Sequence, residues 1–460
     1  METTKVQESA ILVLYMNTEL KFDQSISTAI MHANEFLVYT FTIFGAIVGD
    51  TWWGMFKTIA WMSIVYSLGN FVVALAAIQP LNLPTLALTI TGLFILAVGS
   101  GGVRPNLSVF GGFQYTSDQT EGLGLYFGLQ YFVMKCGTLV GSLVSPILRG
   151  DVTCFGMDNC YPLAFGTPGI VMLLSFVIFM LGKRFYVKVQ PSKQSMLLLV
   201  SSCIITSIKE KCKSGKLGKK SHWLDYAVTK HGEKLVMETK MVLNVLVMFL
   251  PLPLYWSAFM LQSSRFVFQA TRMNGDFLGW FIIKPDQMIV FNPIISIILF
   301  PICEYIFYPL LEKLGIKSLL QKMTLGGIVA ALGIVCAIFV EIQIKENFIS
   351  IFWLLPQYLF LALSENFLYI ANLNFAYNEA PSSMKSVMSA FVFVTIASGN
   401  LIIVFVTAFK LFPIQVYEFT FFATILFIDM IVFGLLATRY QYSYYTQALI
   451  SQLGISINAN

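Results

Sequence analysis

Apolar residues fill this chain in long runs that are separated by short polar stretches. A run of about 18 or more mostly apolar residues is long enough to cross the roughly 30 Å hydrocarbon core of a bilayer as a helix. Such runs cover residues 27–49, 58–79, 84–101, 122–147, 163–182, 237–260, 287–312, 322–342, 350–372, 384–409 and 416–438. Because lipid offers no partners to backbone N–H and C=O groups, only helices suit runs of this length. The pattern predicts an all-α polytopic membrane protein.

A shorter apolar stretch, Ala10 to Met16, precedes the first full run. It is too short to cross a bilayer, and no small-residue cleavage site follows it, so a signal peptide is a poorer interpretation. We interpret it as the end of a first helix of which most is missing. The chain then has two six-helix halves, the layout expected of the major facilitator fold, in which the halves rock around a site near the bilayer midplane.

Charge supports this layout, because only 12% of the residues are charged and 57% are hydrophobic. Residues 183–240 form the longest polar stretch and hold nearly half of the 29 Lys and Arg residues. The positive-inside rule places this stretch in the cytoplasm, where it can also meet anionic lipid; we expect no nucleic-acid partner. The predicted units are an N-terminal half at 1–182, a basic cytoplasmic loop at 183–236, a C-terminal half at 237–440 and a cytoplasmic tail at 441–460.

Ionisable residues inside predicted spans are costly, at about 2.5–3.5 kcal/mol each on insertion scales, and therefore indicate function. His32, Glu35 and Tyr39 are spaced i, i+3 and i+7, which puts three proton-binding or hydrogen-bonding groups on one helical face. This spacing favours a proton relay. The alternative is that His32 lies near the outer end of its span and only meets water.

Cations and a carboxyl group are divided between the two halves. Arg104 and Lys135 lie in spans of the first half, with Tyr131 on the same face as Lys135, and Glu365 lies in the second half. Opposite charges on opposite halves can hold a zwitterion, and we expect Arg104 to face Glu365. Purely structural salt bridges would explain the same residues.

Glycines surround Arg104 in residues 97–112, but no phosphate-binding loop of the G-x-x-x-x-G-K-[ST] type is present. We interpret Gly101, Gly102 and Pro105 as a packing hinge that lets neighbouring helices approach closely. Asp50 and Gly54 belong to a turn between two spans and are interpreted in the same way. Cys154 and Cys160 share one short loop and can form a disulfide if that loop faces an oxidising compartment.

Several segments resemble the proton-coupled oligopeptide transporters of the major facilitator superfamily, and within them the animal intestinal and renal type of solute carrier family 15. The resemblance runs from about residue 10 to residue 440. It rests on the segments AILVLYMNTELKFDQSISTAIMH, GAIVGDTWWGMFKTI, GSGGVRPNLSVFGGFQY, CYPLAFGTPG, IKPDQM, LPQYLF, SENF and NFAYNEAPSSMKSVMSA.

The resemblance implies uptake of di- and tripeptides driven by a proton gradient across the plasma membrane, apical in some epithelia, by a monomer that needs no cofactor except the coupling proton. It implies a role for His32 in proton coupling, which we extend to Glu35 and Glu365. It also implies that Glu365 receives the peptide's amino end. The implied pocket residues are Tyr15, Tyr39, Arg104, Tyr131, Lys135, Trp256, Asn292 and Glu365.

The chain also departs from the family pattern. It begins after the family's Glu-x-x-Glu-Arg motif, and residues 340–357 join two spans directly where the animal transporters carry a large extracellular domain. Arg104 replaces a lysine of the family pattern, Lys135 replaces an asparagine, and Met260 replaces a residue with a carboxyl group. A truncated or degenerate paralogue with a regulatory role, and a transporter of histidine or nitrate, therefore remain alternatives. We expect neither an enzyme nor a metal site, because no nucleophile elbow and no metal-spaced His/Cys set is present.

Overall fold

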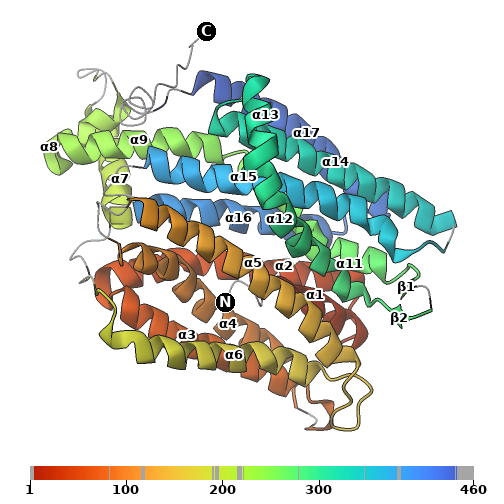
Figure 1. The fold of residues 1–460 in the computed structure, drawn as a ribbon. Coiled ribbons are helices and arrows are strands. Elements are labelled where there is room, and N and C mark those ends of the chain that lie inside the picture. Colours follow the sequence, from red (N-terminus) through yellow and green to blue (C-terminus); the bar gives the residue numbers. More distant parts are fainter. Residues whose placement is uncertain are drawn as a thin grey trace.

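A computed structural model describes most of the chain, and its helices gather into two groups that lie one above the other in Figure 1. The described residues are 5–81, 83–115, 120–188, 191, 196–214, 220, 222–277, 279–346, 348–380, 385–440 and 442.

In the described part of residues 5–188, the first group holds six α-helices. They are α1 (Lys5–Thr18), α2 (Gln24–Ile47), α3 (Met55–Ala76), α4 (Thr85–Gly112), α5 (Thr120–Gly150) and α6 (Tyr161–Leu181). A π-helical turn at Val48–Trp52 extends α2, and single 3-10 turns lie at Gln79–Leu81 and Gly182–Arg184. We call this group the first half.

The second group holds the helices that follow the basic loop, and we call it the second half. They are α9 (Glu233–Phe249), α10 (Leu252–Met260), α11 (Arg265–Ala270), α12 (Phe291–Ile302), α13 (Tyr308–Lys313), α14 (Leu319–Glu346), α15 (Leu355–Glu379), α16 (Lys385–Ala408) and α17 (Gln415–Arg439). Short 3-10 turns lie at Leu261–Ser263, Pro285–Val290 and Ile351–Leu354, and a π-helical turn at Cys303–Phe307 joins α12 to α13.

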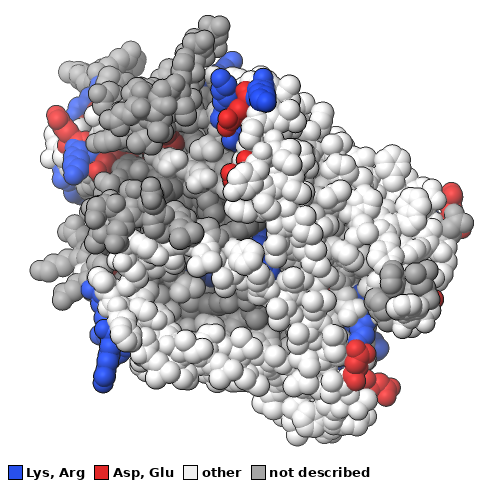
Figure 2. Space-filling model, viewed as in Figure 1, with Lys and Arg blue, Asp and Glu red and all other residues white. Residues whose placement is uncertain are grey.

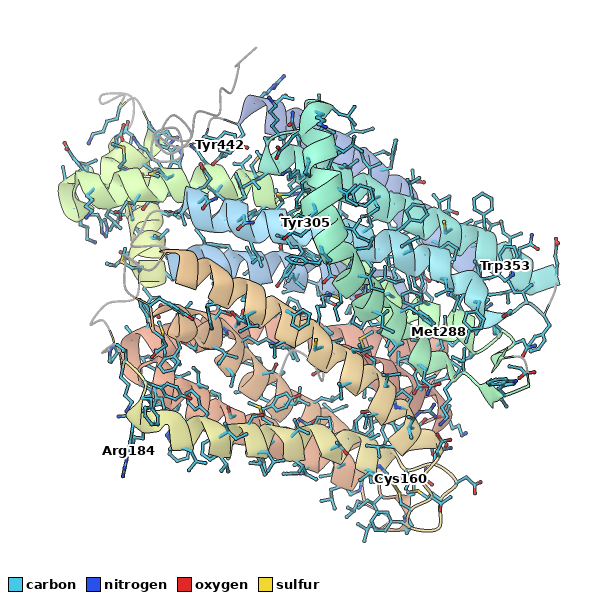
Figure 3. The ribbon with its side chains drawn as sticks, in the orientation of Figure 1. Cys160, Arg184, Met288, Tyr305, Trp353 and Tyr442 are labelled. Carbon is cyan, nitrogen blue, oxygen red and sulfur yellow. A yellow bond between two sulfur atoms is a disulfide. The ribbon has the colours of Figure 1, made fainter. Side chains whose placement is uncertain are left out.

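Small elements occupy the two ends of the molecule. At one end, α7 (Met196–Ser214), a 3-10 turn at Trp223–Ala227 and α8 (Val228–His231) belong to the basic loop. At the other end, β1 (Asp276–Phe277) pairs antiparallel with β2 (Phe281–Ile282). Cys160 and Arg184, at opposite ends of α6, mark these two ends in Figure 3. We call the Cys160 end the outer end and the Arg184 end the inner end, following the positive-inside rule.

All eleven predicted apolar runs fall on helices. Among the described residues, ten helical stretches are long and apolar enough to cross a membrane. An eleventh span consists of α9 and residues 252–270, which are bent by 45° relative to each other. Pro251 and Pro253 explain the bend, because proline lacks the N–H that a helix interior needs. On the face in Figure 2, most charged side chains gather toward the two ends, and the broad belt between them is uncharged except for small blue areas near its middle. The all-α polytopic fold class is confirmed.

The predicted end of the third run, at residue 101, is wrong. The helix α4 continues to Gly112 although it contains Pro105. Tertiary packing outweighs the local weakness, because α4 lies along both α2 and α3 through this glycine-rich part. The helix therefore carries Arg104 in its interior rather than at its end.

Candidate functional site

A buried ion pair joins the two halves of the molecule. Lys135 Nζ, on α5, lies 2.5 Å from Glu365 Oε1, on α15. The Ser296 hydroxyl, on α12, donates to the other carboxylate oxygen, Oε2, at 3.3 Å. Lys135 and Glu365 are only 6% and 8% exposed, so both charges are largely removed from water. Lys135 is thus the first-half cation that contacts Glu365, an arrangement that a purely structural salt bridge also explains.

Arg104 contacts residues other than Glu365, which it was expected to face. Its guanidinium carbon lies 5.3 Å from the centre of the Tyr39 ring, and its Nε donates to Ser100 Oγ at 3.2 Å. Tyr39 in turn stacks on Phe393 of α16. Lys135, rather than Arg104, contacts Glu365, so the expectation that Arg104 faces this carboxylate is wrong. The reason is that Lys135 reaches Glu365 from α5, and sequence spacing cannot rank two cations on different helices.

His32 is completely buried and bonds to the second half with both ring nitrogens. Nδ1 lies 2.8 Å from Asn400 Oδ1, on α16, and Nε2 lies 2.9 Å from Ser264 Oγ. Glu35 lies one turn further along α2 and is also buried. The alternative that His32 merely meets water at the end of its span is therefore wrong.

Other predicted pocket residues come from several helices. Trp256 Nε1 donates to Thr395 Oγ1 at 3.1 Å, and the Trp256 ring lies edge-on to Tyr369. Asn292 is buried one turn before Ser296, and within the described residues its Nδ2 has no hydrogen-bond partner. Tyr15 packs its ring against α6, and the side chain of Tyr131 lies outside the described part of the chain.

The residues interpreted as hinges lie where α2, α3 and α4 meet. A Cβ atom added to Gly101 would lie 2.5 Å from Phe41 Cβ, and one added to Gly102 would lie 2.3 Å from Met62 Cγ. Asn106 of α4 also links α4 to α2. Its Nδ2 donates to the carbonyl oxygens of Gly45 and Gly102 at 2.8 Å each. These positions require glycine because the neighbouring helices approach so closely.

The two remaining hinge residues lie in the connection between α2 and α3. Asp50 belongs to the π-helical turn that follows α2. Gly54 has a φ of 78° and directly precedes α3. This backbone conformation is unfavourable for residues with a Cβ atom, so Gly54 is suited to start the helix.

Ion pairs also join the halves at the outer end, and the sequence did not single them out. Arg149 of α5 forms a bidentate pair with Asp286, with Nε and Nη2 each 2.9 Å from a carboxylate oxygen. Lys284 Nζ lies 2.6 Å from Asp151 Oδ2, and Lys410 pairs with Asp23. Charges at the ends of spans also meet water and lipid headgroups, so sequence alone gave no signal that these would pair.

The Lys410 ammonium group holds the pKa of Asp23 below its ordinary value of 3.8, and the Ile26 N–H supports this by donating to the same carboxylate. A disulfide joins Cys154 to Cys160 in the loop between α5 and α6. Among the described residues, no group of three His, Cys, Asp or Glu side chains is arranged to hold a metal ion.

Two groups of membrane-spanning helices that meet at a buried charged centre define a polytopic membrane protein of the major facilitator type. A family model described as PTR2, the POT family, matches residues 56–418. The chain belongs to the POT family.

Named relatives agree with this assignment. The chain is 43% identical over 337 residues to peptide transporter family 1 of Drosophila melanogaster, covering 73% of this chain and 45% of that protein. It is 40% identical over 342 residues to human solute carrier family 15 member 2, covering 73% and 46%. The chain thus spans about half the length of the curated relatives it matches. The crystal structure of the POT family transporter PepTSo superposes with a TM-score of 0.80 at 25% identity, covering 96% of each chain.

Proposed function

We propose that this protein carries di- and tripeptides across the plasma membrane together with protons, by alternating access of a central site to the two sides. The observation that carries the proposal is the buried charged centre between the halves, where Lys135 and Glu365 meet at 2.5 Å. A zwitterionic peptide presents the same two charges, so it can exchange partners with this pair. Relatives that are named peptide transporters support the substrate class.

His32 supports the proton-coupling part of the proposal. Asn400 Nδ2 donates to the Ile396 carbonyl oxygen at 3.0 Å, which leaves Asn400 Oδ1 to face His32 as an acceptor. In the neutral ring Nδ1 therefore carries the proton, and Nε2 accepts from the Ser264 hydroxyl. Because that hydroxyl can rotate and accept instead, Nε2 can gain a proton without loss of either contact.

Substrate binding is proposed for residues of both halves. Arg104 is always charged and is suited to the peptide's carboxylate, because a guanidinium binds a carboxylate through two parallel hydrogen bonds. Glu365 is suited to the amino end, and Asn292 has an N–H group available for a backbone carbonyl. Tyr15, Tyr39, Tyr131 and Trp256 remain proposed pocket residues.

Uptake by proteoliposomes tests the proposal. The purified chain is reconstituted, and accumulation of radiolabelled dialanine is measured with an inward proton gradient at an external pH of about 6. We expect accumulation above protein-free liposomes, abolished by a protonophore and strongly reduced by His32→Gln. No uptake by correctly folded protein would overturn the proposal and favour a non-transporting paralogue, whereas uptake unaffected by the protonophore would overturn proton coupling. Stronger competition by histidine or nitrate than by unlabelled dialanine would assign a different substrate.

A further inference from the structure

A second buried ion pair lies inside the second half, next to the Ser264 hydroxyl that contacts His32. Arg265 of α11 binds Glu418 of α17 through two atoms, because its Nε lies 2.8 Å from Oε1 and its Nη2 lies 2.8 Å from Oε2. Arg265 and Glu418 are 5% and 3% exposed, so both charges are removed from water. The transport steps proposed above involve neither side chain, although both lie beside a residue that takes part.

The pair fixes the end of α11 that faces His32. Ser264 directly precedes α11, and its Oγ lies 2.9 Å from His32 Nε2. Gln415 Nε2 also donates to the carbonyl oxygen of Arg265 at 3.1 Å. The helix α17 therefore holds both the backbone and the side chain of Arg265, and with them the position of the residue that contacts the imidazole.

Few other charges act on His32. The ring interacts electrostatically with Glu35, on its own helix, and with Arg265. Lys410, which follows α16, already forms the outer pair described above. Within the described side chains, the other titratable groups on the helices packed against α2 are Tyr15 of α1 and Arg104 of α4. Arg265 is thus the cation next to the hydroxyl that contacts His32.

A neighbouring cation opposes the protonation of an imidazole, because two positive charges then repel each other. Glu418 balances Arg265, so the ring beside this pair meets little net positive charge. A guanidinium does not release its proton in proteins, and it therefore keeps its charge when its partner is lost. Without Glu418, the full charge of Arg265 would act on His32.

We propose that Glu418 determines the pH at which His32 takes up its proton, by balancing the charge of Arg265 beside the Ser264 contact. Glu418 is a positioning residue, since it acts on His32 through Arg265. This inference rests on the proposed function.

The pH profile of uptake tests the inference. Accumulation of radiolabelled dialanine in proteoliposomes is measured at external pH values from about 5 to about 8. The proteins compared are the wild type, Glu418→Gln and the double variant Arg265→Met with Glu418→Gln. Half-maximal uptake by Glu418→Gln should require about a tenfold higher proton concentration than in the wild type, because an unbalanced cation then acts on the ring. The double variant carries neither charge, so its midpoint should return to that of the wild type.

Two control variants separate charge from structure. Glu418→Asp keeps the negative charge and should keep the wild-type midpoint. Glu341 is another buried carboxylate, and it binds Arg272 through both oxygens at 2.8 and 2.7 Å. Arg272 follows the end of α11 and is not adjacent to Ser264. Glu341→Gln therefore removes a comparable partner, yet its midpoint should lie within about twofold of the wild-type proton concentration.

The outcomes separate the inference from the function on which it rests. Lower uptake by Glu418→Gln at every pH, with an unchanged midpoint, would overturn the inference, because the pair would then serve only the structure. A shifted midpoint in the double variant would also overturn it, and this measurement applies even if Glu418→Gln does not fold. Wild-type uptake that does not depend on pH would instead overturn the proposed proton coupling.

Discussion

The Lys135–Glu365 pair is the residue-level feature on which the central site depends. Removing two charges from water is costly, and their attraction compensates only while both partners are present. Ser296 adds a hydrogen bond to the same carboxylate, so the arrangement is satisfied as observed. Replacing one partner should therefore lower the folding stability much more than replacing both partners.

We predict that Glu365→Gln destabilises the protein by about 3–5 kcal/mol, because it leaves the buried ammonium of Lys135 without its counter-charge. The double variant Glu365→Gln with Lys135→Met should lie closer to the wild type than Glu365→Gln alone. Thermal unfolding in detergent, followed by tryptophan fluorescence, measures all three proteins. Additive losses in the double variant would contradict a direct ionic interaction between the two residues.

A second residue-level prediction concerns the orientation of His32. Asn400→Leu removes the acceptor that fixes the proton on Nδ1. A hydrogen bond of this kind contributes about 0.5–1.5 kcal/mol, so proton-driven uptake should fall about threefold to tenfold. Asn400→Asp keeps an acceptor oxygen and serves as the matched variant. Equal uptake by Asn400→Leu and the wild-type protein would show that this contact does not serve proton coupling.

At the scale of elements, close packing of α2, α3 and α4 is what positions Arg104. The three helices approach through glycines, and Asn106 ties α4 to α2 by donating to a backbone carbonyl oxygen. Membrane helices gain little from a hydrophobic effect between them, so such close contacts and interhelical hydrogen bonds contribute much of their association. A side chain added here should separate the helices.

We predict that Gly101→Ala destabilises the protein by about 1–3 kcal/mol, the usual cost of forcing extra atoms into a packed core. Its Cβ atom would lie 2.5 Å from Phe41 Cβ, and the α2 backbone lies directly behind that atom. Gly166→Ala on α6 is the control, because its Cβ atom would meet only Ala74 Cβ, at 3.7 Å. Thermal unfolding of the two variants should differ clearly, and similar unfolding temperatures would contradict this account of α4.

At the scale of the whole molecule, the outer end holds the two halves together by ion pairs. The Arg149–Asp286 pair is bidentate, and the Asp286 side chain is fully buried. Lys284–Asp151 and Lys410–Asp23 lie closer to water and should contribute less. Under the proposed alternating access, opening toward the outer side would require these pairs to separate.

We predict that Asp286→Asn shifts the protein toward a state that is open at the outer end, because Arg149 loses its counter-charge there. Spin labels on the exposed residues Phe155 and Trp280 report the separation of the halves by electron–electron distance measurements. We expect a larger fraction of long distances in Asp286→Asn than in the wild type. An unchanged distribution would contradict a role for this pair in outer closure.

The Asp23–Lys410 pair yields a prediction about pH. The pKa of Asp23 is lower in the folded protein than its ordinary value of 3.8. The contribution of the ion pair to folding stability is therefore complete above pH 3.8 and is lost only as the pH falls through the lower folded pKa. The pair should therefore persist unchanged from pH 7 to pH 5. Spin-label distances across the outer end that are measured from the loop carrying Lys410 should not depend on pH in that range. The variant Lys410→Gln should lengthen these distances at pH 7. A transition between pH 7 and pH 5 that disappears in Lys410→Gln would contradict the lowered pKa.

The sequence by itself determined the class of protein and most of the membrane-spanning helices, including that His32, Lys135 and Glu365 belong inside them. It could do so because a bilayer leaves each backbone segment to satisfy its own hydrogen bonds, which makes the helix a local property of an apolar run. Which charges meet was decided only by the tertiary structure. Lys135 rather than Arg104 contacts Glu365, and Asp286 pairs with Arg149, because such contacts depend on how helices from different halves are packed. No spacing within one helix encodes that arrangement.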